Sequence, residues 1–93
     1  MRELRLEEFQ GREGATFELL LDQEAVPLTL AAVRVLRPSG REAGAFTLEW
    51  RGPAEPVLPQ AIYTLRLGDD RFEMFIVPLG QDQDEVRYEA VFN

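Results

Sequence analysis

The sequence contains no cysteine and no histidine among its 93 residues. The absence of cysteine excludes disulfides, thiolate catalysis and Cys-based zinc sites. The absence of histidine removes the usual general base and the commonest metal ligand. Ser39 is the only serine, and without a histidine to activate it serine catalysis is nearly excluded. We therefore expect a non-enzymatic protein with no catalytic residues, no cofactor and no metal.

Lysine is also absent, so the ten basic residues are all arginine, against 17 acidic residues and a net charge of −7. A genomic base-composition bias or a need for bidentate pairing would each explain the arginines. A net negative charge argues against binding a phosphate backbone and suits solubility or a basic partner. We expect no nucleic-acid partner.

Long apolar runs are missing as well. None approaches the roughly 20 residues that a membrane-spanning helix needs. The first residues, MRELRLEEF, lack the apolar region of a secretory signal. We expect a cytoplasmic protein without membrane partners, formed by a single domain over residues 1–93.

The apolar residues that are present alternate mostly with polar ones, as in half-buried strands. A short helix or helical turn is predicted at Arg2–Gln10, with Leu6 and Phe9 on one face and Gly11 as a C-cap. A change of apolar phase at Ala31–Ala32 indicates a bulge or bend. Six strands are predicted, at 16–22, 26–36, 45–51, 61–67, 71–77 and 86–92.

This spacing of short strands, with turn residues between them, predicts an all-β fold. We expect a small antiparallel six-stranded barrel or roll, because closure removes exposed sheet edges. The short N-terminal helix would dock over a sheet or a barrel end. Residues 37–44, RPSGREAG, read as a surface hairpin loop, and residues 78–85, PLGQDQDE, as another loop.

The connection Gly52–Pro59 contains three prolines and is predicted to be extended. Polar residues around it form the candidate site, either as a hydrogen-bonded clasp that holds the connection or as a partner or ligand site. Arg51 and Glu89 are expected to pair across the sheet, and Gln60 to satisfy backbone groups of the connection. The whole candidate set is Arg51, Gln60, Tyr63, Tyr88 and Glu89.

A second apolar face opposes the main core positions, and the strand at 71–77, which contributes to it, is apolar on both of its faces. Part of this face is expected to be covered by the N-terminal helix. If the rest is exposed, a protein partner or a homo-oligomer is the natural interpretation. Its residues are Leu20, Ile62, Phe75, Val77 and Val91.

Two further groups have both a structural and a functional interpretation. The acidic residues Asp82, Asp84 and Glu85 lack the spacing of a calcium loop, which favours a solvated turn. The aromatic residues fill the core or, alternatively, line the pocket of a small-ligand-binding β-barrel. They are Phe46, Trp50, Tyr63 and Phe72.

Four stretches of the chain carry a resemblance to a known family: FTLEWRGP (46–53), LPQAIYTL (58–65), MFIVPLG (74–80) and YEAVFN (88–93). They resemble a family of small bacterial domains of unknown function, with the pattern F-S-L-x-F-R-G-P, L-P-Q-G-x-Y, L-F-x-V-P-x-G and Y-E-A-V-F-N. Trp50 replaces an aromatic residue, and Ala61 stands where the family often has glycine. The resemblance implies no known activity. Its loose association with phage-tail-collar-like proteins implies a structural or assembly role in a phage-tail-like or surface assembly.

Overall fold

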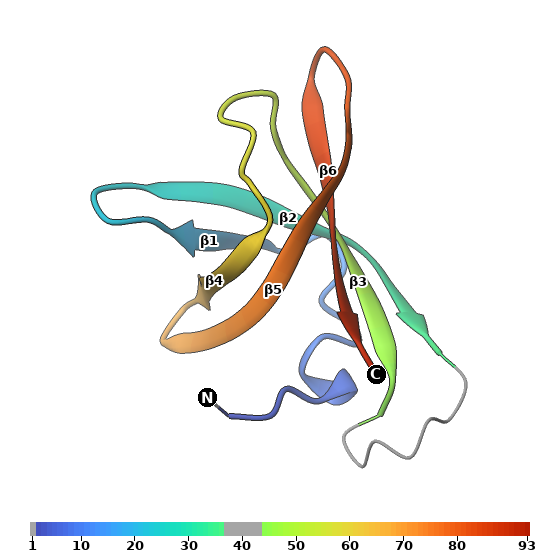
Figure 1. Cartoon of the computed structure of the whole chain (residues 1–93). Helices are drawn as coiled ribbons and strands as arrows, with labels where there is room; N and C mark the ends of the chain where they lie inside the picture. Colours follow the sequence, from blue (N-terminus) through green and yellow to red (C-terminus); the bar gives the residue numbers. More distant parts are fainter. Residues whose placement is uncertain (1, 37–43) are drawn as a thin grey trace.

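Six antiparallel strands close into a barrel in the order β1-β2-β3-β6-β5-β4 (Figure 1). The structure is a computed structural model that describes residues 2–36 and 44–93. The strands are β1 Thr16–Leu20, β2 Ala25–Val35, β3 Phe46–Pro53, β4 Ala61–Leu67, β5 Asp70–Gln81 and β6 Glu85–Phe92. The predicted all-β antiparallel barrel is therefore confirmed.

Strand β3 shows why this sequence forms a barrel. Every second residue from Phe46 through Leu48 and Trp50 is fully buried, while the residues between them are half-buried. Successive side chains of a strand point to opposite faces, so one face enters the core and the other meets solvent. Because the apolar set lies on one phase, a slip of one residue would expose all of it.

The closing seam joins β1 to β4, with Leu19 opposite Leu65. Strand β3 does not pair with β4, which follows it in the chain, but with β6, over eight residue pairs from Phe46↔Phe92 to Pro53↔Glu85. Residues 54–60 must therefore cross an end of the barrel to reach β4. The strand order could not be read from the sequence, because it depends on which distant strands meet.

The predicted irregularity in the second strand is confirmed. The pairing of β2 with β3 shifts between Leu30 and Ala32, so one extra residue is inserted there. A bulge of this kind bends a strand and increases its twist, which helps a sheet to close. After the shift the alternation weakens, and Val35 at the end of β2 is exposed.

Of the short helix or helical turn predicted at Arg2–Gln10, the structure has the turn. The structure has only a single 3-10 turn, η1, at Leu6–Glu8. So short a segment gains little from its own hydrogen bonds. Phe9, immediately after the turn, is instead completely buried at one barrel end. The expectation that this segment docks over a barrel end is confirmed (Figure 1).

The loop predicted at residues 78–85 is also wrong, because most of it is strand. Strand β5 continues to Gln81, and only residues 82–84 lie between β5 and β6. The pairing shifts between Pro78 and Gly80. A bulge is one of the few places where a sheet accepts a proline, which lacks an N–H donor. The loop predicted at residues 37–44 falls almost wholly outside the described residues.

The core is apolar throughout the described residues: no polar or charged residue there is buried as a whole. Five aromatic residues have less than 2% of their surface exposed within the strands, and Phe9 joins them from the N-terminal segment. Within residues 2–36 and 44–93, no helix has the length and apolar character that crossing a membrane requires.

Candidate functional site

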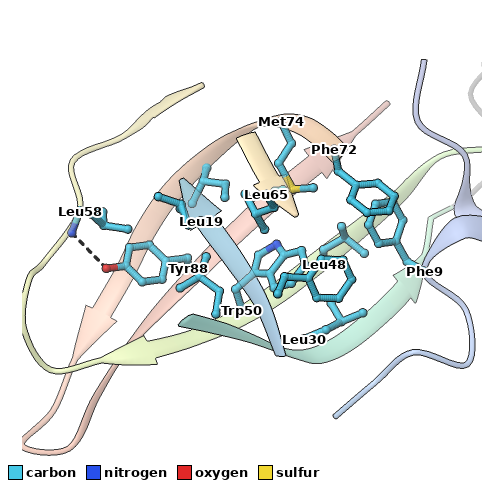
Figure 2. Close-up of a cluster of buried hydrophobic side chains, with 14 of the residues drawn as sticks. Phe9, Leu19, Leu30, Leu48, Trp50, Leu58, Leu65, Phe72, Met74 and Tyr88 are labelled. Atoms are coloured by element: carbon cyan, nitrogen blue, oxygen red, sulfur yellow. Dashed lines mark hydrogen bonds between the residues drawn. The ribbon is translucent and has the colours of Figure 1, made fainter. Parts of the chain in front are cut away.

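Two of the five candidate residues hold the connection at residues 54–60. The backbone N–H of Leu58 donates to the hydroxyl of Tyr88 over 3.0 Å, and both residues are buried (Figure 2). The hydroxyl of Tyr63 donates to the carbonyl of Pro59. Burial raises the pKa of Tyr63, so its hydroxyl stays protonated and remains a donor at neutral pH. We call this pair of contacts the tyrosine clasp.

Arg51 lies outside the tyrosine clasp and is the centre of an ion-pair network. Its Nε and Nη2 donate to one oxygen of Glu49 at 3.0 and 2.9 Å, and its Nη1 donates to Glu85. Arg34 reaches the other oxygen of Glu49 at 3.3 Å. The hydrogen bond from Arg51 holds the pKa of Glu49 below its ordinary value, and the same bond raises the pKa of Arg51.

The pairing expected between Arg51 and Glu89 is not what the structure shows. In the register of β3 with β6, Glu89 lies opposite Glu49, while Arg51 lies opposite Arg87. Arg51 therefore reaches along its own strand to Glu49 and diagonally to Glu85, and no ion pair of Glu89 exists among the described residues.

Gln60 does not satisfy the connection either, since it is exposed and its side chain makes no hydrogen bond within the described part of the chain. That role is taken by Gln81, whose amide donates to the carbonyl of Ala54 at 3.4 Å. No feature of the sequence distinguished Gln81. Gly52 was also missed: a Cβ there would lie 2.7 Å from Leu28 and 3.2 Å from Tyr88. A glycine inside a strand pattern is a known sign of such close approach.

The acidic turn between β5 and β6 has a structural role. One carboxylate oxygen of Asp82 accepts the backbone N–H groups of Asp84 and Glu85, at 2.8 and 2.9 Å. These hydrogen bonds lower the pKa of Asp82. Glu85 is engaged by Arg51. Among the described residues, no three His, Cys, Asp or Glu side chains come together as a metal-binding group.

Phe46, Trp50 and Phe72, three of the four aromatic residues considered for a ligand pocket, pack against the rings of Phe9 and Phe17. Phe17 meets Trp50 edge to face with ring centroids 4.9 Å apart, and Phe17 lies 5.6 Å from Phe72. The core side chains fill the space between the strands (Figure 2). The indole Nε1 of Trp50 is buried with no hydrogen-bond partner in the described structure. An unsatisfied donor of this kind costs about 1–3 kcal/mol, which the burial of the large ring offsets.

The surface hollows are open depressions, and one of about 470 Å³ lies beside Arg51, lined also by Thr16, Thr29 and Gly52. The two threonine hydroxyls are 3.1 Å apart and bond to each other. The guanidinium of Arg51 is already occupied by two carboxylates. This hollow therefore offers a ligand little unsatisfied hydrogen-bonding capacity.

Another part of the surface has apolar side chains that are exposed to solvent. On the outer side of β4, β5 and β6, Ile62, Phe75 and Val91 are 58%, 51% and 49% exposed, and Val77 is half-buried. Ile62 lies directly opposite Phe75 in the register, at the spacing of touching side chains. We call these four residues the apolar face.

The expectation that the N-terminal segment covers part of this surface is wrong. Phe9 packs against rings at the barrel end and leaves the outer side of β5 open. The remaining residue of the predicted set, Leu20, is half-buried on β1 opposite Thr64, and so does not adjoin Phe75.

Together, the fold and surface define a closed six-stranded antiparallel barrel with a filled interior and an exposed apolar face on three adjacent strands. A family model described as a domain of unknown function, DUF6916, matches residues 4–92, and the chain belongs to this family. The predicted membership of an unknown-function domain family is thus confirmed. No curated protein and no solved structure matches the chain.

Proposed function

We propose that this domain is a non-enzymatic interaction module that binds a protein partner through the apolar face. The observation that supports the proposal is the exposure of Ile62, Phe75 and Val91, each by about half, on one side of the barrel. Contiguous exposed apolar side chains on a small domain are typical of interaction surfaces.

The closed barrel favours this mode of binding over strand addition. Each of the six strands is hydrogen-bonded to two neighbours over part of its length, which restricts the free edge open to an incoming strand. The outward-facing side chains are therefore the larger surface that the barrel offers to a partner. Among those side chains, an aromatic ring such as Phe75 provides the largest apolar area, and aromatic residues are common anchors of interfaces.

A structural role in a phage-tail-like or surface assembly is part of the proposal. The sequence motifs resemble domains loosely associated with phage-tail-collar-like proteins, and assemblies of that kind need rigid modules that bind neighbours. The missing catalytic residue types, cysteine and histidine, support a role in binding rather than catalysis.

The proposal is tested by removing the apolar face without disturbing the core. The double variant Ile62→Ser/Phe75→Ser changes two exposed side chains, and Val35→Ser/Val57→Ser is a matched control at two exposed apolar positions outside β4, β5 and β6. Peptides are selected against the immobilised wild-type domain from a displayed random library, and their affinities are then measured by fluorescence anisotropy.

We expect the face variant to bind the selected peptides at least about 10-fold more weakly, because truncating an interface anchor commonly costs more than about 1.4 kcal/mol. The control is expected to bind as the wild type does. Circular dichroism verifies that both variants remain folded. Peptides that bind the face variant and the wild type equally would contradict the proposal.

A further inference from the structure

We infer that the partner presents an apolar side chain between two cationic side chains, Lys or Arg, spaced about 14 Å apart. The inference rests on the proposed function and adds the chemistry of the occupant. The cationic side chains are inferred from two carboxylates, Glu73 and Glu89, which flank the apolar face at opposite corners. The spacing follows from four residues along β5 at about 3.3 Å each and one interstrand step of about 4.8 Å.

The placement of both carboxylates follows from the register. Glu73 is exposed and lies two residues before Phe75, so both side chains leave the same face of β5. Glu89 on β6 lies opposite Val77. Phe75 thus lies between an acidic group on its own strand and another on the next strand.

Neither carboxylate has an ion pair or a side-chain hydrogen bond within the described residues. The outward carboxylates of Glu18, Glu49 and Glu85, by contrast, are each bound by an arginine. Glu89 lies directly opposite Glu49, and like charges in that position destabilise a sheet. Arg51 and Arg34 compensate the charge of Glu49, whereas Glu89 has no ion pair among the described residues, and a cation from a partner would supply one.

The nearby arginines do not neutralise these groups. Arg51 and Arg66 are held by other carboxylates. Arg71 and Arg87 lie two residues before Glu73 and Glu89 on the same strands, on the side away from the apolar face. The charges that adjoin the apolar face are therefore negative, and the arginines lie beyond them.

A second copy of the chain fits this surface poorly. In a two-fold dimer docked face to face, with its axis along or across β5, each of the two carboxylates would meet a carboxylate of the other copy. The net charge of −7 on each copy adds to the repulsion. A partner with cationic flanks has the complementary charge.

The test uses three displayed peptide libraries that differ at two fixed positions. The positions are four residues apart, which spans about 13 Å in an extended chain, and hold two Lys, two Ser or two Glu. The residue midway between them is apolar and faces the same side as the fixed pair, and the other positions are random. The libraries are selected against the wild-type domain, and individual peptides are measured by fluorescence anisotropy.

We expect the Lys library to yield binders about 10-fold tighter than the Glu library at low salt, with a smaller difference at high salt. In Glu73→Gln/Glu89→Gln the Lys peptides should lose about 3- to 10-fold in affinity, while the Ser peptides are unchanged. The matched control Glu13→Gln/Glu24→Gln changes the net charge equally at two exposed sites outside β4, β5 and β6, and should keep the preference.

The alternative outcomes separate the two proposals. Peptides that need Ile62 and Phe75 but show no Lys preference, or a preference that survives Glu73→Gln/Glu89→Gln, would overturn the inference and leave the proposed function standing. If no library yields peptides that depend on those two residues, the proposed function fails and the inference with it. A dimer detected by light scattering and abolished by Ile62→Ser/Phe75→Ser would identify a second copy as the occupant and overturn the inference.

Discussion

The two ends of the barrel are closed by different chemistry. At one end, Phe9 lies with its ring centroid between 5.3 and 6.5 Å from four other phenylalanine rings, so the contact is wholly apolar. At the other end, residues 54–60 are held by the buried Leu58, whose N–H bonds to Tyr88 (Figure 2). Hydrogen bonds to Tyr63 and Gln81 hold the same segment.

The difference follows from what each segment can bury. The N-terminal segment supplies a large aromatic ring, which binds an apolar end without needing a partner for any polar atom. The connection crosses the barrel end, and a buried N–H such as that of Leu58 must find an acceptor. Closure of the apolar end depends on the volume that the Phe9 ring fills, whereas the tyrosine clasp depends on individual hydrogen-bond donors and acceptors. The two ends should therefore respond differently to substitution.

The largest effect is expected from Phe9→Ala at the aromatic end. The side chain is completely buried, and its removal leaves a cavity, which typically costs about 3–5 kcal/mol. Urea denaturation measures the loss, and Val57→Ala, at an exposed position of the opposite end, should cost less than about 0.5 kcal/mol. A loss below about 1 kcal/mol for Phe9→Ala would mean that the ring does not close the barrel.

Gly52→Ala should have the next largest effect, at the clasp end. The new methyl group would lie 2.7 Å from Leu28 and 3.2 Å from Tyr88, and overpacking of this kind costs about 1–3 kcal/mol. Thermal unfolding checks the loss. Shortening the neighbour in Gly52→Ala/Leu28→Val should cost less than the sum of the two single changes. Simple additivity would show that the methyl group does not meet Leu28.

Tyr88→Phe removes the hydroxyl and keeps the ring, so it measures the contribution of the hydrogen bond alone. Removing the hydroxyl leaves the buried N–H of Leu58 without its acceptor, which costs about 1–3 kcal/mol. Tyr63→Phe is the matched comparison, because the carbonyl of Pro59 that it frees is exposed to water; about 0.5–1 kcal/mol is expected. Equal losses for both variants would show that burial does not distinguish the two bonds of the tyrosine clasp.

The smallest effect is on the pH dependence of stability. The pKa of Glu49 is held below its ordinary 4.5 in the folded state, chiefly by Arg51. The unfolded chain therefore binds a proton first as the pH falls, and the stability that this group contributes above about pH 4.5 is lost as the pH drops through its folded value.

In Glu49→Gln the free energy of unfolding should fall less steeply between about pH 5 and pH 3 than in the wild type. Denaturation series over that range provide the measurement. Glu3→Gln, at an exposed residue without an ion pair in the described structure, is the control and should leave the slope unchanged. A wild-type slope in Glu49→Gln would contradict the role assigned to its ion pair.

The sequence predicted those features that depend on local alternation. The phase of Phe46, Leu48 and Trp50 determined the buried face of β3, because period two is a property of the strand itself. Tyr88 and Tyr63 belong to the predicted candidate set, but the role of satisfying the connection's backbone groups was expected of Gln60.

Features that depend on register were not predictable. Arg51 reaches Glu85 on β6 and not Glu89, because the register places Arg51 opposite Arg87. A shift of two residues would have placed Glu89 opposite Arg51. Phe75 was expected to be covered because strands apolar on both sides usually are, but no segment of the described chain reaches its outer side. Gly52 is the exception, since a glycine in a strand pattern could have indicated the contact with Leu28.

The seam between β1 and β4 has a consequence for how the barrel assembles. It is the shortest ladder of the barrel, and it joins Leu19 to Leu65, far apart along the chain. The hairpin β1–β2 and the meander β4–β5–β6 can each form from strands that are neighbours in the chain. Formation of the seam closes a long loop and therefore costs more conformational entropy. The barrel is therefore expected to be sealed last, and its first strand is the one most readily released when the native state opens.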